Sequence, residues 1–69
     1  MRLSARNQLP GTVVSVDTGA VMATVVIRLN GGEEVVAAIT KDSAESLQLT
    51  AGDTVTAVIK ATEVMVGKD

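Results

Sequence analysis

The chain has to form its core without aromatic side chains. Its 69 residues include no Phe, Tyr or Trp, and no Cys or His. A domain below about 70–80 residues usually gains only ~3–5 kcal/mol from one core, and aliphatic residues bury less area than aromatic ones. Because disulfides and thiolate metal sites are excluded, association between subunits is the remaining source of stability. We therefore expect a single domain, residues 1–69, in an obligate oligomer.

Branched residues and turn signals predict an all-β fold with one short helix. Twelve valines and eight threonines favour strands, because branched side chains fit a pleated surface. Turn signals lie at Asp17-Thr18-Gly19, Asn30-Gly31-Gly32 and Ala51-Gly52-Asp53, and the second of these predicts a hairpin. The apolar segments between the turns lie near 12–17, 20–29, 33–40, 54–60 and 62–66. Five segments predict a five-stranded barrel.

Alternation along two segments predicts which side chains face the core. The first inward set is Val21, Ala23, Val25, Ile27 and Leu29, and the second is Val55, Ala57 and Ile59. The opposite faces are only partly polar, since they include Val26 and Val58. A valine on an outer face is either exposed or covered by another subunit, and the small core favours the second interpretation.

One helix is expected at about Lys41 to Leu47. Asp42-Ser43-Ala44-Glu45 matches a capping box at its start. Leu47 and Leu49 are expected to anchor the helical segment on the barrel.

The polar segment from Ser4 to Gly11 is the first candidate binding site. A hydroxyl, a guanidinium and two carboxamides lie within five residues, and none is a proton-transfer catalyst near neutral pH. All of them donate hydrogen bonds to an anion, and Arg6 adds charge and a planar fork. The alternatives are that Arg6 pairs with an acidic neighbour, and that Asn7 and Gln8 satisfy backbone groups of an edge strand.

Two further segments offer donors for an anion. Thr40 and Ser43 bracket the predicted helix start, where unpaired N–H groups carry partial positive charge. The alternative is that one of these hydroxyls only caps the helix. Lys60 ends the last long strand and would add a point charge beside the backbone N–H of Ala61, unless it is an ordinary surface lysine.

Composition disfavours several other functions. Single-strand nucleic-acid binders use aromatic platforms and basic grooves, whereas this chain has a net charge of −2 and a pI near 4.9. The longest apolar run, 35–39, is far too short to span a membrane, and no secretory signal follows Arg2. No nucleophile and base are arranged for catalysis. We expect a complete cytoplasmic chain that is not an enzyme and uses no cofactor.

Taken together, three motifs resemble those of the molbindins, the small Mop-type molybdate-binding proteins. The motifs are Ser4-Ala5-Arg6-Asn7-Gln8-Leu9-x-Gly11, Ala38-Ile39-Thr40-x-x-Ser43 and Val58-Ile59-Lys60-Ala61-Thr62-x-Val64. The resemblance covers essentially the whole chain. It implies an OB-like β-barrel assembled into a hexamer, a trimer of dimers, with oxyanions bound between subunits.

The resemblance also implies which residues hold the anion. The oxyanion-binding set is Ser4, Ala5, Arg6, Thr40, Ser43, Lys60 and Ala61. The expected ligand is molybdate, or tungstate, held as an intact oxyanion with no protein ligand to the metal. The leading hypothesis is intracellular molybdenum storage or homeostasis. The alternative is an anion-sensing regulatory module that acts on a partner protein.

Overall fold

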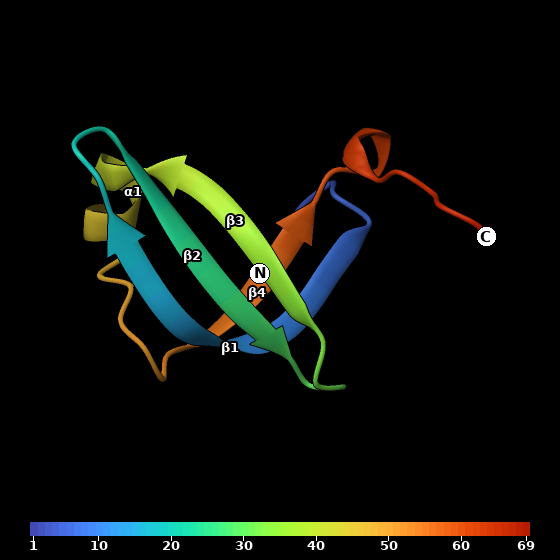
Figure 1. The fold of residues 1–69 in the computed structure, drawn as a ribbon, viewed down its shortest axis with the longest axis horizontal. Coiled ribbons are helices and arrows are strands. Elements are labelled where there is room, and N and C mark those ends of the chain that lie inside the picture. Colours follow the sequence, from blue (N-terminus) through green and yellow to red (C-terminus); the bar gives the residue numbers. More distant parts are fainter.

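The computed structural model describes all 69 residues, and it forms a single curled sheet with one short helix (Figure 1). The elements in chain order are β1 (Asn7–Thr18), β2 (Met22–Leu29), β3 (Glu34–Thr40), α1 (Lys41–Ser46), β4 (Thr54–Ile59) and the 3-10 turn η1 (Ala61–Glu63). The sheet order is β3-β2-β1-β4, and each neighbouring pair is antiparallel. The predicted all-β class with one short helix is confirmed.

The chain contains four strands, so the expected fifth strand at 62–66 is wrong for the single chain. After β4 the backbone turns through η1 and leaves the sheet, and the C-terminal residues extend away from it (Figure 1). A strand forms only where its backbone groups find a partner, and no sheet edge of this chain lies beside the tail. The sheet is therefore a curled half-barrel rather than a closed barrel.

Strand β1 is the longest, and it bends between two partners. Its first half, 7–12, pairs with β4, and its second half, 11–18, pairs with β2. Gly11 lies in the overlap, where a Cβ would lie 2.5 Å from the carbonyl oxygen of Arg28. Glycine thus allows the two backbones to approach at the bend. The apolar pattern predicted only 12–17 of this strand, because its first part is polar.

The core lies on the concave face of the sheet. Its buried residues there are Val13, Val25, Ile27 and Ala57, with Ala23 buried close by. The inward alternation predicted for β2 is confirmed from Ala23 onward, and that of β4 is confirmed throughout. Val21 is the exception. It is 71% exposed, because it lies in the turn before β2 begins rather than in the strand.

Helix α1 follows β3 without a linker. Its N-cap is Thr40, whose side chain accepts a hydrogen bond from the Ser43 N–H at 3.0 Å, so the predicted capping box at Asp42 is wrong. The cap falls at the last strand residue because Thr40 is still extended and the next residue is already helical. Leu49 packs against the core as expected, whereas Leu47 is exposed.

The hairpin predicted at Asn30-Gly31-Gly32 is confirmed. It connects β2 to β3, and Gly32 adopts a positive φ of 100° that favours glycine. The Leu29 N–H donates to the Glu33 carbonyl at 2.7 Å, which closes the loop. None of the helices in the structure is long enough to cross a membrane.

Candidate functional site

The pairing of β1 with β4 brings two distant segments of the sequence together. Asn7 lies opposite Ile59, so the residues just before β1 lie beside those just after β4. Together these segments line an open pocket of about 530 Å³. Its lining residues are Ser4, Ala5, Arg6, Val58, Lys60, Ala61 and Thr62.

Two carboxamides hold these segments in place. The Asn7 side chain donates to the Ile59 carbonyl at 3.2 Å, which ties the start of β1 to the end of β4. The Gln8 side chain donates to the Ala5 carbonyl at 2.8 Å and fixes the bend that precedes the strand. The alternative interpretation of both residues, that they satisfy backbone groups, is confirmed. They hold the segments that line the pocket, and neither residue is itself among the lining residues.

The pocket carries positive charge without a matching negative charge. Arg6 and Lys60 are its only ionisable side chains, and no carboxylate lines it. The two ion pairs of the chain, Arg28–Glu34 at 2.7 Å and Lys41–Glu45 at 3.8 Å, involve neither residue. The alternative in which Arg6 pairs with an acidic neighbour is therefore wrong. Both cations are exposed and free to contact an anion.

Backbone donors add to this charge. The N–H groups of Ala5 and Ala61 donate to no acceptor within the chain. The carbonyl oxygen of Lys60 instead accepts from the Glu63 N–H at 2.9 Å as η1 forms. The η1 turn therefore satisfies the Lys60 carbonyl, whereas the Ala61 N–H remains without an acceptor. The pocket thus offers hydroxyl, guanidinium, ammonium and amide donors, a set suited to an oxyanion.

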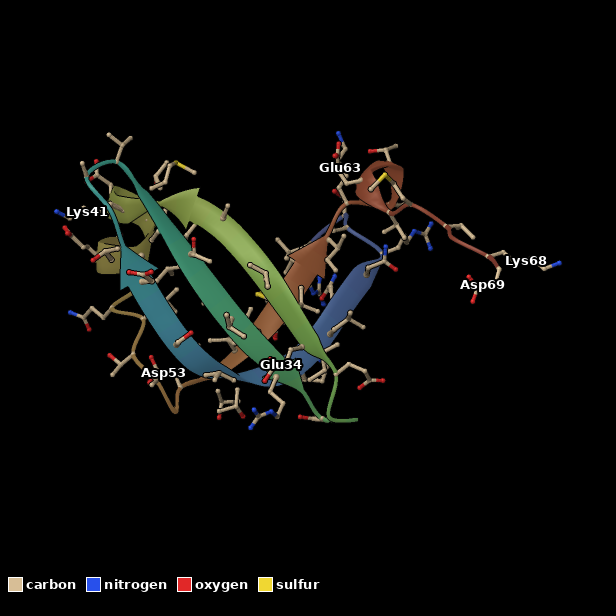
Figure 2. All side chains as sticks on the ribbon, in the orientation of Figure 1. Glu34, Lys41, Asp53, Glu63, Lys68 and Asp69 are labelled. Carbon is tan, nitrogen blue, oxygen red and sulfur yellow. The ribbon has the colours of Figure 1, made fainter.

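The other two predicted site residues lie at the opposite end of the molecule. Thr40 and Ser43 belong to the α1 end, and η1 marks the other end; Lys41 and Glu63 show this separation in Figure 2. The Thr40 hydroxyl donates to the Ser43 Oγ at 2.7 Å, in addition to capping the helix. The capping role that the sequence left open is confirmed. One chain therefore brings together five of the seven predicted residues.

Sequence reasoning left out two residues that line the pocket. Thr62 and Val58 both fall within the late motif that ends at Val64, so the signal was present but was not applied to them. Thr62 adds a second hydroxyl to the lining, beside that of Ser4. The chain holds no group of three or more acidic residues that could bind a metal ion directly.

Comparison with known proteins places this arrangement in a family. The family model described as "TOBE domain" matches residues 3–66. Molybdenum-pterin-binding protein 3 of Clostridium pasteurianum is 50% identical over 66 residues, which are 96% of this chain and 97% of that protein. The molybdenum transport protein ModE of Herbaspirillum seropedicae is 52% identical, and the match covers 93% of this chain but 24% of ModE.

Solved structures agree with the sequence matches. A molybdate-binding protein from Sporomusa ovata has a TM-score of 0.92 and 50% identity, with 99% of this chain and 100% of that chain covered. MopII from Clostridium pasteurianum also has a TM-score of 0.92, with 43% identity and coverage of 97% and 100%. These names describe binding and transport rather than catalysis, in line with the expectation that the chain is not an enzyme. The chain belongs to the TOBE-domain family, among its small Mop-type members, as the resemblance predicted.

Proposed function

We propose that this chain binds molybdate, and also tungstate, as intact oxyanions between the subunits of a homo-oligomer. The observation that supports this most is the pocket at the β1–β4 end, in which Arg6 and Lys60 face a cavity without any carboxylate. The names of the relatives support molybdenum as the element bound. The proposed role is storage or homeostasis of molybdenum in the cytoplasm, without a cofactor and without enzymatic chemistry.

The chemistry of the donor set favours molybdate over the common cellular anions. Molybdate and tungstate are tetrahedral dianions that carry no proton at neutral pH, so a site made of donors satisfies them fully. Phosphate keeps at least one proton at that pH and needs a hydrogen-bond acceptor. No carboxylate lines this pocket to accept it, and the charged side chains Arg6 and Lys60 only donate. Sulfate has the same charge as molybdate but shorter bonds, so the size of the closed cavity has to separate the two. Molybdate and tungstate are not separated by such a site.

The binding free energy expected from these donors is sufficient for micromolar affinity. Charge-assisted hydrogen bonds contribute about 1.5–3 kcal/mol each, and a dissociation constant of 1 μM corresponds to about 8 kcal/mol. Several such bonds therefore reach micromolar binding or better. The net charge of −2 does not oppose binding, because the local field of Arg6 and Lys60 governs the pocket.

A second subunit is required to complete the site. The pocket is open and its charged side chains are exposed, so one chain encloses a tetrahedral anion on one side only. Thr40 and Ser43 lie too far away to contribute within the same chain, but a neighbouring copy can present its α1 end to the pocket. We infer that each anion lies between copies, in a hexamer built as a trimer of dimers. Binding then stabilises the assembly by mass action.

The alternative function is a sensing role. The match to ModE, which covers only part of that protein, supports this alternative. The chain corresponds to only 24% of ModE, so in that protein a related domain is one part of a longer chain. A free-standing copy of the domain would have to pass its signal to a separate partner. A pull-down that recovers a partner only in the presence of molybdate would favour sensing over storage.

Calorimetry and native mass spectrometry test the proposal together. We expect purified protein, freed of bound anions, to bind molybdate and tungstate with similar affinity and phosphate not measurably. Native mass should give six subunits, and the melting temperature should rise with added molybdate. A monomer, or a melting temperature that molybdate leaves unchanged, contradicts the proposal. Elemental analysis of protein purified without added anion identifies the element carried.

A further inference from the structure

The tip of the β2–β3 hairpin carries an asparagine–glycine pair that takes no part in the proposed anion site. Asn30 and Gly31 are both exposed, and they lie in the turn that follows β2. In such a pair the side-chain amide and the next backbone nitrogen meet with little steric hindrance, since glycine has no side chain. The chain has one other asparagine, Asn7, which is followed by Gln8 within β1. The two asparagines therefore provide a comparison within one molecule.

Two backbone hydrogen bonds close the hairpin loop without using the atoms of the pair. The Gly32 N–H donates to the Leu29 carbonyl at 2.9 Å, and the Leu29 N–H donates to the Glu33 carbonyl at 2.7 Å. A turn followed by a glycine of positive φ is a common three-residue hairpin loop, and Gly32 has a φ of 100°. The Gly31 N–H has no acceptor within the chain, and the Asn30 carboxamide has no partner either. The loop thus stays closed while both of these groups remain free.

Asn7 is held in the opposite way. It lies within β1 opposite Ile59, and its carboxamide donates to the Ile59 carbonyl at 3.2 Å. The next residue, Gln8, pairs with Val58 on β4, so the backbone on this side is part of the sheet. A carboxamide that is bonded and a backbone that is paired cannot approach each other without opening the β1–β4 ladder. Only Asn30 has both groups free.

We propose that Asn30 of the folded protein deamidates spontaneously to isoaspartate, with water as the co-reactant. The Gly31 nitrogen loses its proton to solvent base and attacks the Asn30 Cγ. A bond forms between these two atoms and the bond from Cγ to Nδ2 breaks, so that the amide takes up a proton and leaves as ammonia. Water then opens the resulting five-membered succinimide ring. Opening at the backbone carbonyl gives isoaspartate, and opening at Cγ gives aspartate.

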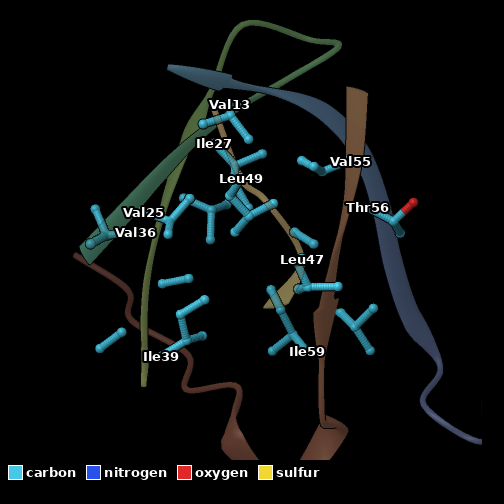
Figure 3. Close-up of a pocket in the computed structure, with 15 residues that line it drawn as sticks. Val13, Val25, Ile27, Val36, Ile39, Leu47, Leu49, Val55, Thr56 and Ile59 are labelled. Atoms are coloured by element: carbon cyan, nitrogen blue, oxygen red, sulfur yellow. The ribbon is translucent and has the colours of Figure 1, made fainter. Parts of the chain in front are cut away.

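The modification changes the hairpin and leaves the rest of the molecule intact. It places a new carboxylate near Glu33 and Glu34 and makes the net charge one unit more negative than −2. The aliphatic side chains that line the concave hollow of the sheet (Figure 3) include none from residues 30–33. The charged pocket has no residue from the hairpin either, and Glu34 and Glu63 mark the separation of the two regions in Figure 2. The inference is therefore independent of the proposed function, and the modified chain should stay folded.

Peptide mapping tests the inference, because the two asparagines lie on separate tryptic peptides. Cleavage after Arg6, Arg28 and Lys41 gives peptides 7–28 and 29–41, each with one asparagine. The full chain is kept in warm, mildly alkaline buffer, and both peptides are followed by mass spectrometry. An isoaspartate-specific methyltransferase labels the main product. We expect peptide 29–41 to deamidate at least tenfold faster than peptide 7–28, with one ammonia released per converted chain.

Two variants test the two reacting groups separately. Asn30→Gln requires a less favourable six-membered ring, and Gly31→Ala hinders the attacking nitrogen, so each should lower the rate at least fivefold. The methyl group of Gly31→Ala would lie 2.5 Å from a carboxylate oxygen of Glu33, but this side chain is exposed and can move aside. Asn30→Asp reproduces the charge of the product. It should keep the subunit number and the molybdate affinity of the wild-type protein.

Two results overturn the inference. One is a native protein in which peptide 29–41 deamidates no faster than peptide 7–28. The other is a native rate at Asn30 more than tenfold below that of the same chain unfolded in urea, since the hairpin would then protect the pair. A wild-type protein that does not bind molybdate would remove the proposed function and leave these rates unchanged.

Discussion

The two ends of the molecule offer hydrogen-bond donors in different states. At the β1–β4 end, Arg6 and Lys60 have no partner within the chain. At the α1 end, the Thr40 hydroxyl already caps the helix and donates to Ser43. The β1–β4 end thus has two cations without an ion-pair partner, whereas the Thr40 hydroxyl at the α1 end already has partners in its own chain. The difference teaches that a site residue is recognised by what it leaves unsatisfied, rather than by its type alone.

Strand β1 is the physical connection between these ends, so its bend gives the largest expected effect. Gly11→Ala places a methyl group 2.5 Å from the Arg28 carbonyl oxygen and 2.9 Å from the Ile27 Cγ2. The Arg28 oxygen belongs to the backbone, so it moves away only if β1 and β2 separate there. We expect a loss of about 2–3 kcal/mol in the free energy of unfolding, measured by urea titration. Gly67→Ala is the matched control, since no atom lies within 4 Å of its added methyl group.

The charged end is tested by removing its cations one at a time. Arg6→Ala and Lys60→Ala should each weaken molybdate binding at least tenfold by calorimetry, because each removes a charge-assisted hydrogen bond. The subunit number should remain that of the wild-type protein. Arg28→Ala is the control, since Arg28 pairs with Glu34 outside the pocket. Wild-type affinity in both pocket variants would show that these residues are not the anion ligands.

The role of the α1 end is tested by removing the hydroxyls of Thr40 and Ser43 one at a time. The Thr40 hydroxyl donates to Ser43 Oγ, which leaves the Ser43 hydrogen free to point elsewhere. Thr40→Ala should therefore lower the free energy of unfolding by about 1 kcal/mol, through loss of the cap. Ser43→Ala should leave stability nearly unchanged and weaken molybdate binding about fivefold, the value of one neutral hydrogen bond of ~1 kcal/mol. An unchanged affinity in Ser43→Ala would remove the α1 end from the site.

The parts of the fold that depend on local pattern could be predicted from the sequence. Alternation in β2 and β4 identified the core face, and the glycines of Asn30-Gly31-Gly32 identified the hairpin. The start of β1 could not be found in this way. Asn7 and Gln8 are extended because they pair with Ile59 and Val58, about fifty residues away. The prediction of a fifth strand at 62–66 was wrong for the same reason, since a strand needs a partner and neither edge of this sheet lies beside the tail.

The candidate site was predicted from the resemblance to a family rather than from local sequence pattern. Nothing in the linear spacing places Ser4 to Arg6 beside Lys60 and Ala61; the register of β1 on β4 does so. The resemblance to a family supplied that pairing, and the structure supplies its geometry. The resemblance could not reveal that Thr40 and Ser43 lie at the far end of the chain. Their proposed contribution depends on a second copy, in line with the binding between subunits that the resemblance implies.

The smallest expected effect tests whether an unpaired cation is sufficient for binding. Glu34→Gln frees Arg28 from its 2.7 Å ion pair, and both side chains are about half exposed. A surface pair of this kind contributes about 0.5 kcal/mol, so the free energy of unfolding should fall by no more than that in a urea titration. Calorimetry should show unchanged stoichiometry and affinity for molybdate. One freed arginine on the outer face of β2 lacks the backbone N–H groups that Ala5 and Ala61 offer beside Arg6. An additional molybdate site in Glu34→Gln would mean that charge alone selects the anion, and the contrast between the two ends would lose its basis.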